Sequence, residues 1–494
     1  MTVNAMQQQD WDPRSEAVQR DQRAAYDEMR ERCPVAYSDF LGWSLFRHED
    51  ILRVLNDPAT FSNAVSRHLS VPDGMDPPEH TAFRRMIMPY FEPERVAAFE
   101  PQCREIAATL VQALQARDEV EFIDNFANGF AIRSQCASLG WPLDLCEPLR
   151  LWTAKNRQAT FAEDRAAMAE IAREFEGYVQ ELLKIRRVAG DQASDDITSS
   201  LLRQRVQGRP LRDEEIVSVL RNWTVGEIGT ISAALGILAH HLSEHPDLQQ
   251  QLRTQPSLLP AAIEEILRIH GPLVANRRIT TRAVEIGGRK IAAGERISLI
   301  WISANRDGRV FEDPATCRLD RDQTANLLYG AEIHVCPGAP LAGMEMRVAM
   351  EELLTAHGRD RPGPGETANH RRVPRQWFRQ LASADPIRPS CFWLPKKGPA
   401  QICGLRRAKH TILAKTQNCV RVLSNPNPVL TNRQSMAGVC FGPAIHGRNV
   451  KEACSLLQPS PQPSRTRFSH PRRRSRRNGA LLHFRQLAQV LAAA

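Results

Sequence analysis

The chain has 494 residues, of which 42% are hydrophobic and 24% are charged. These values are typical of a globular protein and exclude a chain that is disordered throughout. No run reaches the roughly eighteen apolar residues of a membrane span, and the polar N-terminal segment lacks the apolar stretch of a secretory signal. The eleven cysteines form no C-x-x-C pair, which favours a reducing, cytoplasmic location.

The net charge of +9 divides unevenly along the chain. Residues 1–357 contain 40 basic and 52 acidic side chains, whereas residues 358–494 contain 25 basic and 4 acidic ones. The second part is also rich in proline and lacks a sustained helical or strand period, so we expect no packed core there. Its basicity alone would permit a nucleic-acid-binding protein, but the acidic first part gives no reason to expect nucleic acid as a partner.

The first part is expected to form a mainly α-helical domain with a small β region, over residues 1–357. Apolar residues spaced three or four apart indicate long amphipathic helices. Helices are predicted over 164–187, 213–244, 260–270 and 341–355. Turns at Gly287-Gly288 and Ala293-Gly294 separate short alternating runs, which predict hairpin strands.

Cys336 lies in the loop before the last of these helices, in the sequence Tyr-Gly-Ala-Glu-Ile-His-Val-Cys-Pro-Gly from Tyr329 to Gly338. A lone cysteine is usually a small buried hydrophobe. Here the sulfur would lie just before a helix N-terminus, where backbone N–H groups and the helix dipole stabilise a thiolate. A thiolate held in this way can be the axial ligand of haem iron.

This loop resembles the haem-binding loop F-G-x-G-x-H-x-C-x-G of the cytochrome P450 family. The matching residues are Gly330, His334, Cys336 and Gly338. Glu332 stands where the family usually has glycine, a departure that would strain the loop or place a charge near the thiolate. The resemblance covers most of residues 20–357. It implies the single-domain cytochrome P450 fold and haem b ligated by Cys336, with Gly338 beside it.

Glu265 and Arg268 form an E-x-x-R pattern some seventy residues before the cysteine loop. By itself the pattern is an everyday ion pair between residues one helical turn apart. In the family the same pattern lies at this distance from the cysteine. The resemblance therefore implies that Glu265 and Arg268 brace the cysteine loop.

The resemblance also indicates which residues hold the two haem propionates. His80 and Arg84 are four residues apart, so both side chains share one helix face. Arg278 and His334 occupy two further positions that carry propionate ligands in the family. Two carboxylates need cationic or N–H donors of this kind. The alternative for each residue singly is a solvated basic side chain.

A long helix of the family carries (A/G)-G-x-(D/E)-T, in which the acid and the alcohol relay protons. This chain has Val-Gly-Glu-Ile-Gly-Thr from Val225 to Thr230, which places Glu227 one position early and Thr230 one late. The two residues share a helix face, so they can form an equivalent relay through water. Alternatively, Glu227 is a solvated or paired carboxylate and Thr230 bonds a preceding carbonyl. The protein would then use hydrogen peroxide directly.

The resemblance implies a soluble bacterial monooxygenase, cytoplasmic and monomeric, that inserts one oxygen atom of dioxygen into a small organic substrate. Electrons would come from NAD(P)H through a ferredoxin reductase and a ferredoxin. Substrate contacts are expected from about Phe61 to Gly74 and from Trp223 to Thr230. A peroxide-dependent peroxygenase and a catalytically dead haem-binding product remain alternatives.

The tail lacks the closing segment Y-P-x-S-G-F-x-x-L-P-V-R-I of the family. Residues Val373–Asp385, however, have synonymous codons that read Tyr-Pro-Ala-Ser-Gly-Phe-Ala-Asn-Leu-Pro-Leu-Arg-Ile one nucleotide later. Trp377 has a single codon, and with the phenylalanine that follows it forces glycine at the required place. We therefore predict a frameshift near residues 355–358, terminal β-strands that are missing, and an arginine-rich tail that is accidental.

Overall fold

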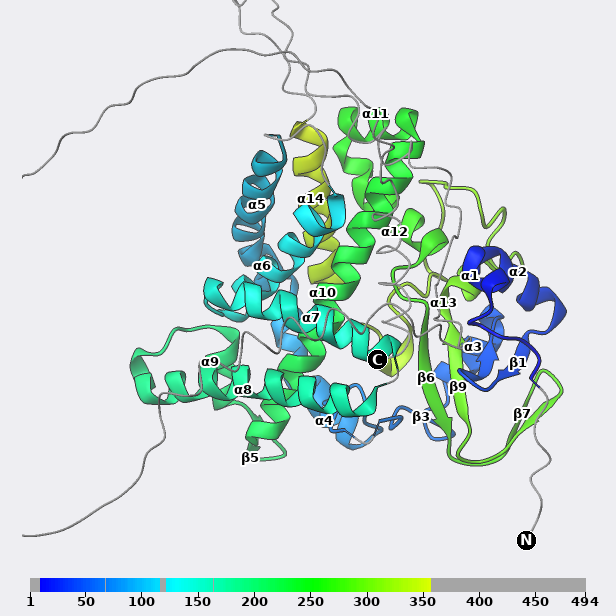
Figure 1. Ribbon diagram of the computed structural model, residues 1–494, viewed down its shortest axis with the longest axis horizontal. Helices are drawn as coiled ribbons and strands as arrows, with labels where there is room; N and C mark the ends of the chain where they lie inside the picture. Colours follow the sequence, from blue (N-terminus) through cyan, green and yellow to red (C-terminus); the bar gives the residue numbers. More distant parts are fainter. Residues whose placement is uncertain (1–8, 67, 116–120, 163, 357–494) are drawn as a thin grey trace, which may run out of the picture. The chain divides into compact units, whose positions relative to one another are not determined.

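The computed structural model describes residues 9–356 except 67, 116–120 and 163. The predicted out-of-frame tail, residues 358–494, lies outside the described residues. In the described part the helices are α1 (Glu16–Arg20), α2 (Gln22–Arg32), α3 (His48–Leu55), α4 (Glu79–Ile87), α5 (Pro93–Gln115), α6 (Asn128–Leu139), α7 (Cys146–Phe161), α8 (Arg165–Ala189), α9 (Ile197–Arg203), α10 (Asp213–Glu244), α11 (Pro246–Thr254), α12 (Leu259–His270), α13 (Trp301–Ala304) and α14 (Ala339–Ala356). Short helical turns are η1 (Met88–Phe91), η2 (Ile123–Ala127), η3 (Leu143–Leu145), η4 (Gly190–Gln192), η5 (Pro256–Leu258) and η6 (Glu332–His334). The mainly helical fold is thus as predicted (Figure 1).

The four helices predicted by periodicity are present as α8, α10, α12 and α14, with ends within two residues of the prediction. α8 begins where the Asp164 side chain accepts a hydrogen bond from the Ala167 N–H over 3.0 Å, as an N-cap should. Its buried residues include Ile171, Phe175 and Val179, which are members of the predicted apolar stripe. Burial of one face therefore explains why this segment is helical.

The strands form one five-stranded sheet and two hairpins among the described residues. The strands are β1 (Val35–Ser38), β2 (Gly42–Leu45), β3 (Phe61–Ser62), β4 (Arg205–Val206), β5 (Arg209–Pro210), β6 (Ala275–Thr280), β7 (Val284–Ile286), β8 (Arg289–Ile291) and β9 (Arg296–Ile300). The sheet has the order β1-β2-β9-β6-β3, and only its β2–β9 pair is parallel. The predicted hairpin turn at Gly287-Gly288 is confirmed, with φ values of +55° and +74° that favour glycine.

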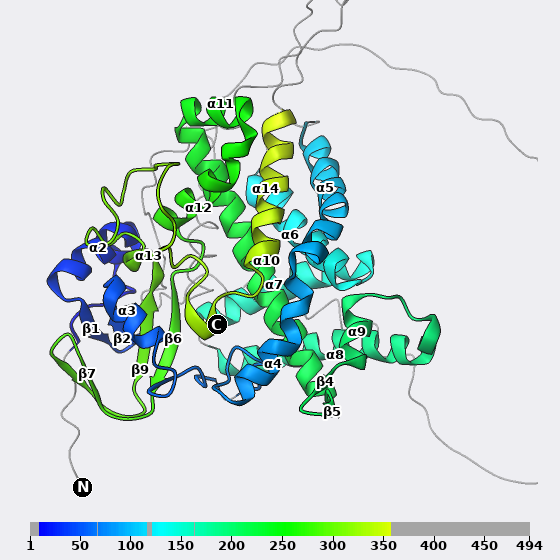
Figure 2. The same ribbon diagram turned by 180° about the vertical axis from the view of Figure 1, so that it is seen from behind.

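The central helix, α10, organises the helical part of the fold. It contacts α6, α12 and α14, and α14 in turn lies alongside α5 (Figure 2). By length and composition α10 is apolar enough to cross a membrane, but most of that apolar window is buried against the other helices. Its hydrophobicity is therefore accounted for by the core of the fold. The same packing holds α14 and the loop before it against α10.

Candidate functional site

Cys336 ends a tight loop directly before α14. The Cys336 N–H donates to the Tyr329 carbonyl over 2.8 Å, and Gly330 supplies a φ of +72° at the turn. The Cys336 side chain is exposed, yet desolvation raises the pKa of its thiol, against the lowering effect of the Gly338 and Ala339 N–H groups that donate to the sulfur. The loop thus presents one sulfur atom that is accessible and yet closely surrounded by protein.

Glu332 takes up the conformation for which the family uses glycine. Its φ is +59°, in the left-handed region, within the short turn η6. A side chain in this region costs on the order of 1 kcal/mol relative to glycine. The backbone strain expected from the sequence is therefore present at this residue.

The four residues expected at the propionates come together from three parts of the chain. His80 and Arg84 lie on α4, Arg278 on β6 and His334 in η6. The His80 and His334 rings are 4.2 Å apart between centroids. Burial, and then the charges of Arg278, His80 and Arg84, lower the pKa of His334 to about 3. The four side chains thus form one cluster of two cations, Arg84 and Arg278, and two neutral imidazoles, which we call the anion-binding rim.

Several ring nitrogens of the anion-binding rim have no hydrogen-bond partner among the described residues. His80 is 2% exposed, and neither of its ring nitrogens has a hydrogen-bond partner among the described residues. The same holds for Nε2 of His334. Burial lowers the pKa of Arg278 to about 10, although Asp76 works in the opposite direction. Buried donors and cations left in this state fit an anionic group. The residues present therefore fit the propionates of the implied haem.

The surroundings of the cysteine loop include Asp73 and the ring of Phe91. Asp73 is exposed while burial raises its pKa, the combination also seen at Cys336, and its charge acts on both Cys336 and Arg84. The ring of Phe91 lies 3.6 Å from the position of a Cβ on Gly338 and packs against Trp223 of α10, with centroids 5.2 Å apart. The cysteine loop and α10 are therefore linked through one aromatic ring.

Glu265 and Arg268 form a fully buried ion pair. Arg268 donates to both Glu265 oxygens, over 2.8 and 2.9 Å, and both side chains are 0% exposed. Burial alone would raise the pKa of Glu265, but hydrogen bonds from Arg268, Arg321 and Gln323 outweigh it and lower that pKa to about 2. The carboxylate is therefore charged and fully partnered.

The ion pair is connected to the cysteine loop through Asn305. Arg268 donates to the main-chain carbonyls of Asn305, over 2.6 Å, and of Pro314, over 3.0 Å. The Asn305 side chain then accepts a hydrogen bond from the Leu327 N–H over 2.8 Å, at the start of the segment that turns into the cysteine loop. Two hydrogen bonds, one to the main chain and one to the side chain of Asn305, thus lead from the E-x-x-R helix to that segment.

Glu227 does not point toward Thr230. It forms a hydrogen bond with Glu345 of α14, and burial followed by the neighbouring carboxyl raises the pKa of Glu227 well above its usual value. Burial also raises the pKa of Glu345, to about 8. Two carboxyl groups in contact inside a protein cannot both be ionised at low cost. The pair therefore retains at least one proton at neutral pH.

The amide of Gln135 lies between the Thr224 hydroxyl and the Glu227 carboxyl group. The Thr224 hydroxyl has one hydrogen, which it donates to the Leu220 carbonyl over 2.7 Å, so it accepts from Nε2 of Gln135 over 3.3 Å. That orientation turns the amide oxygen toward Glu227. In the opposite orientation the amide nitrogen donates to Glu227 over 3.0 Å, and the Thr224 hydroxyl donates its hydrogen to the amide oxygen over 3.3 Å instead of to Leu220. An amide oxygen facing Glu227 would require a carboxylic acid there, whereas an amide nitrogen is compatible with a carboxylate.

The Thr230 hydroxyl is bonded within its own helix. It donates to the Gly226 carbonyl, four residues before it, and lies 3.3 Å from the Glu227 carbonyl. The structure therefore places the two residues of the predicted relay on one helix without a direct contact between their side chains. Gly226 is exposed although it lies in the middle of α10. This side of the helix borders open space.

The first segment expected to contact substrate, Phe61 to Gly74, is bonded to α10 just before the second, which begins at Trp223. The Ser218 hydroxyl accepts a hydrogen bond from the Val71 N–H over 2.9 Å, and the Asn222 amide donates to Ser70 and Val71 over 3.0 and 3.1 Å. The residues before α4 are thus fastened to the N-terminal half of α10. They form one boundary of the region that α10 faces.

Sequence reasoning missed Glu345 and Gln135. Glu345 had a recognisable signal, because it is an acid within the apolar run Leu-Ala-Gly-Met-Glu-Met-Arg-Val-Ala-Met and would fall on the buried side of that helix. Gln135 has no such signal. Its importance depends on which distant groups the fold brings to it.

Comparison with known proteins shows which family this chain resembles in sequence. The sequence model described as Cytochrome P450 matches residues 149–357. The cyclomarin C epoxidase CymV of Salinispora arenicola is 31% identical over 350 residues, which cover 67% of this chain and 88% of that protein. The erythromycin C-12 hydroxylase of Saccharopolyspora erythraea is 32% identical over 345 residues, 67% of this chain and 86% of that protein.

Solved structures show the same likeness in three dimensions. The cytochrome P450 CYP109Q5 from Chondromyces apiculatus is 29% identical with a TM-score of 0.62, over 69% of this chain and 89% of that chain. The ligand-free cytochrome P450 TbtJ1 is 31% identical with a TM-score of 0.63, over 70% and 92% of the two chains. The fold and the sequence are thus similar to the same set of proteins.

Proposed function

The chain belongs to the cytochrome P450 family of haem-binding monooxygenases, and we propose that it takes its oxygen atom from dioxygen and its electrons from a ferredoxin-type partner. The substrate would be a small organic molecule. The observation that carries the proposal is the shared placement of the exposed Cys336 thiol and the anion-binding rim, which Arg84 joins by donating to the Val335 carbonyl. A ligand with one metal and two carboxylates fits both at once.

The residues of this chain would divide the work of holding the cofactor. When bound, haem supplies the metal that activates oxygen for insertion into an organic substrate. Cys336 would ligate its iron, with Gly338 and Ala339 donating to the sulfur. The anion-binding rim would hold the propionates. The buried pair of Glu265 and Arg268 would keep the cysteine loop in place through Asn305.

Proton delivery is proposed for Glu227 and Thr230 on α10. The partnership of Glu227 with Glu345 supports this role, because it keeps a proton on the helix at neutral pH. Thr230 offers its hydroxyl oxygen as an acceptor while its hydrogen is held by the Gly226 carbonyl. A water molecule between the two side chains would complete the path.

A second function, the use of hydrogen peroxide in place of dioxygen and electrons, is favoured by the same helix. Glu227 is turned to Glu345 and Thr230 is bonded to a preceding carbonyl, which is the arrangement expected for a helix without a relay. Hydrogen peroxide already carries the two electrons that the reductase would supply and the two protons that the relay would supply. The peroxide-dependent reaction needs no reductase.

We also propose that the reading frame changes near residues 355–358. The match to the family ends at residue 357, which supports the proposal. Loss of the closing strands would leave the protein short of one wall of its substrate region, so weak or absent activity of this product is the third possibility. Nucleotide sequencing across this point decides the matter. A gene whose codons do not give the Tyr-Pro-Ala-Ser-Gly-Phe ending in the next frame contradicts it.

The test of the function begins with the reduced carbon monoxide difference spectrum of the haem-loaded protein. Thiolate ligation shifts the Soret band strongly to the red, and Cys336→Ser should abolish the shift. Cys317→Ser is the matched control, because Cys317 is half-buried beside Glu265 and lies outside the loop. Turnover that needs NAD(P)H, reductase and ferredoxin supports the dioxygen reaction. Turnover with hydrogen peroxide alone supports the second function. A red-shifted band without turnover under either condition indicates a non-catalytic product. If the red-shifted band is absent from both the present protein and the frame-repaired protein, the assignment is contradicted.

The predicted monomeric state, cytoplasmic location and lack of a nucleic-acid partner stay predictions. Size-exclusion chromatography with light scattering tests the first. Binding of duplex DNA that weakens steeply with salt would contradict the last.

A further inference from the structure

A row of hydrogen bonds between nitrogen atoms joins three helices at the C-terminal end of α10. Nη1 of Arg23, on α2, lies 2.7 Å from Nδ1 of His270, the last residue of α12. Nε2 of His270 lies 3.2 Å from Nδ1 of His241, on α10. A guanidinium group only donates, so Nδ1 of His270 accepts and its hydrogen is on Nε2, which donates to His241. Both rings are therefore neutral, with fixed tautomers.

The surroundings of the row offer little to neutralise an added proton. His241 is 6% exposed, and its Nε2 has no hydrogen-bond partner among the described residues. The His245 ring stacks on it at 4.1 Å and 17°, with its Nδ1 donating to the His241 carbonyl over 2.7 Å. Of the charged groups that act on the row, Arg23 and Arg306 are cations and Glu244 is held 3.6 Å from His240. A further positive charge would meet mainly cations and other histidines.

Protonation would break the row at its first bond. A protonated His270 carries a hydrogen on Nδ1, which would face the N–H of Arg23, so a donor would meet a donor and a cation would meet a cation. We propose that Arg23, His270 and His241 form a latch, opened by protonation, that holds the N-terminal part of α2 on the ends of α12 and α10. We call this row the histidine latch.

The direction of the titration agrees with this geometry. Burial and the charge of Arg23 lower the pKa of His270 well below its usual value, and burial followed by the neighbouring histidines lowers that of His241 to about 4. A histidine released to solvent titrates near 6.5. Folding therefore favours the neutral rings: the latch contributes its full stability above about pH 6.5 and loses it progressively as the pH falls below that value.

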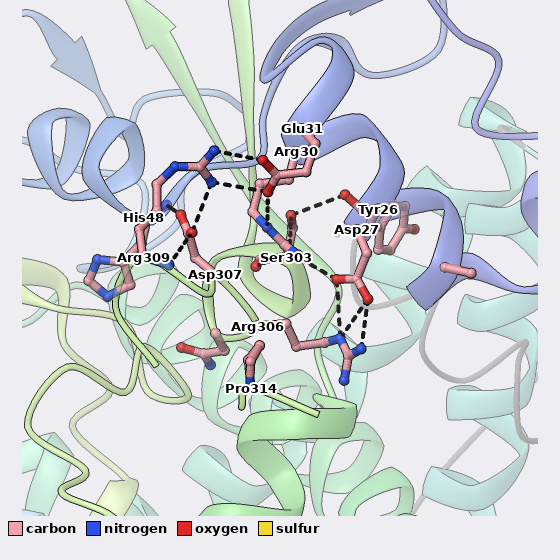
Figure 3. Close-up of polar contacts among 12 residues, drawn as sticks. Tyr26, Asp27, Arg30, Glu31, His48, Ser303, Arg306, Asp307, Arg309 and Pro314 are labelled. Carbon is pink, nitrogen blue, oxygen red and sulfur yellow. Dashed lines mark hydrogen bonds and ion pairs between the residues drawn. The ribbon is translucent and has the colours of Figure 1, made fainter. Parts of the chain in front are cut away.

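A second set of contacts holds the other half of α2 by ion pairs (Figure 3). Asp27 accepts from Arg306 over 2.6 Å, Glu31 accepts from Arg309 over 2.6 Å, and Arg30 donates to the Ser303 carbonyl over 2.8 Å. The hydrogen bond from Arg309 lowers the pKa of Glu31, so acid does not weaken this contact at pH 5.5. Acid should therefore release the N-terminal part of α2 while its C-terminal part stays bound to the segment after α13.

Hydrogen–deuterium exchange of the full-length, haem-loaded protein tests the latch. The reporter is the peptide 16–32, compared at pH 7.5 and 5.5 with times corrected for intrinsic exchange, and peptide 197–203 is the internal reference. Because folding lowers the pKa of His270 well below 6.5, a change from pH 7.5 to 5.5 should weaken protection by up to about tenfold. His270→Gln keeps an acceptor for Arg23 and a donor for His241 but does not titrate, so its change should stay under about twofold.

A second variant and a control separate the latch from general acid damage. Arg23→Gln removes the cation that repels protonated His270, so its acid response should be clearly smaller than that of the wild type. Arg20→Gln is the control, because Arg20 forms only an exposed pair with Glu16 over 3.4 Å among its described contacts, and it should respond as the wild type does. An equal response of the wild type and His270→Gln, or equal loss of protection in 16–32 and 197–203, would overturn the proposal.

Discussion

The substitution Glu345→Gln gives the sharpest test of the buried carboxyl pair, because it removes one titrating group and keeps the size of the side chain. A carboxyl whose pKa is raised by folding favours the native state when it is protonated. Its stabilising effect is complete below the unfolded value of about 4.3 and is lost as the pH rises toward the folded value. For Glu345 that upper value is about 8. The relevant window is therefore pH 4.3 to 8.

The magnitude follows from proton linkage. Each proton that the native state keeps and the unfolded state releases lowers the free energy of unfolding by about 1.4 kcal/mol per pH unit. With the pKa of Glu345 at about 8, this group alone should cost the wild type about 1.4 kcal/mol per pH unit between pH 5 and 7, and Glu227, whose pKa is also raised, adds to that loss. Glu345→Gln should lose about 1.4 kcal/mol per pH unit less than the wild type. Between pH 5 and 7 the free energy of unfolding should thus fall by about 3 kcal/mol less in the variant than in the wild type.

Denaturant unfolding of the haem-loaded protein at several pH values measures these slopes. Infrared spectroscopy supplies a second readout, since a protonated carboxyl absorbs apart from a carboxylate and one such band should vanish in the variant. Glu100→Gln is the control. Hydrogen bonds from Arg347 and Arg104 lower the pKa of Glu100, so this carboxylate makes stability depend on pH only at pH values below about 4.5. Equal slopes for the wild type and Glu345→Gln between pH 5 and 7 would refute a shared buried proton.

Three further predictions concern the cofactor site. Glu332→Gly should stabilise the protein by about 1 kcal/mol and raise haem retention, because it relieves a left-handed φ; denaturant unfolding measures the gain, and a loss of stability would contradict the strain. Arg268→Met should cost about 3 kcal/mol, since it leaves Glu265 without its bidentate partner and two buried carbonyls without a donor; a cost below about 1 kcal/mol would show that the pair is dispensable. Arg278→Gln should weaken haem binding to the apoprotein by tenfold or more, the worth of a charged hydrogen bond, whereas Arg277→Gln, on the opposite face of β6, should not; equal affinities would remove Arg278 from the anion-binding rim.

The long helices could be predicted because their apolar period is local to the sequence. The stripe from Ile171 to Val179 indicates both the helix and its buried face. The E-x-x-R pair was predictable for the same reason, since Glu265 and Arg268 are one turn apart. The carbonyls that Arg268 binds, 37 and 46 residues further along the chain, depend on the tertiary fold and leave no periodic mark.

The relay helix shows where sequence reasoning reached its limit. Spacing places Glu227 and Thr230 on one side of α10, but a side chain turns toward the partner that best satisfies it. Glu227 turns to Glu345, 118 positions further along the chain. The orientation of the Glu227 side chain depends on its burial without a cation nearby, and no local sequence pattern indicates such burial. The sequence predicts the two residues, whereas their partners come only from the fold.

Gly226 also has a practical consequence for altering selectivity. A methyl group built on this glycine meets no atom within 4 Å, and φ does not require glycine there. A larger residue would add helix propensity to α10 and occupy open volume rather than displace neighbours. Substitution of this single residue by alanine, valine and leucine in turn would therefore shrink the adjoining space stepwise. The maximum size of the molecules that can be accommodated there should decrease with each added carbon.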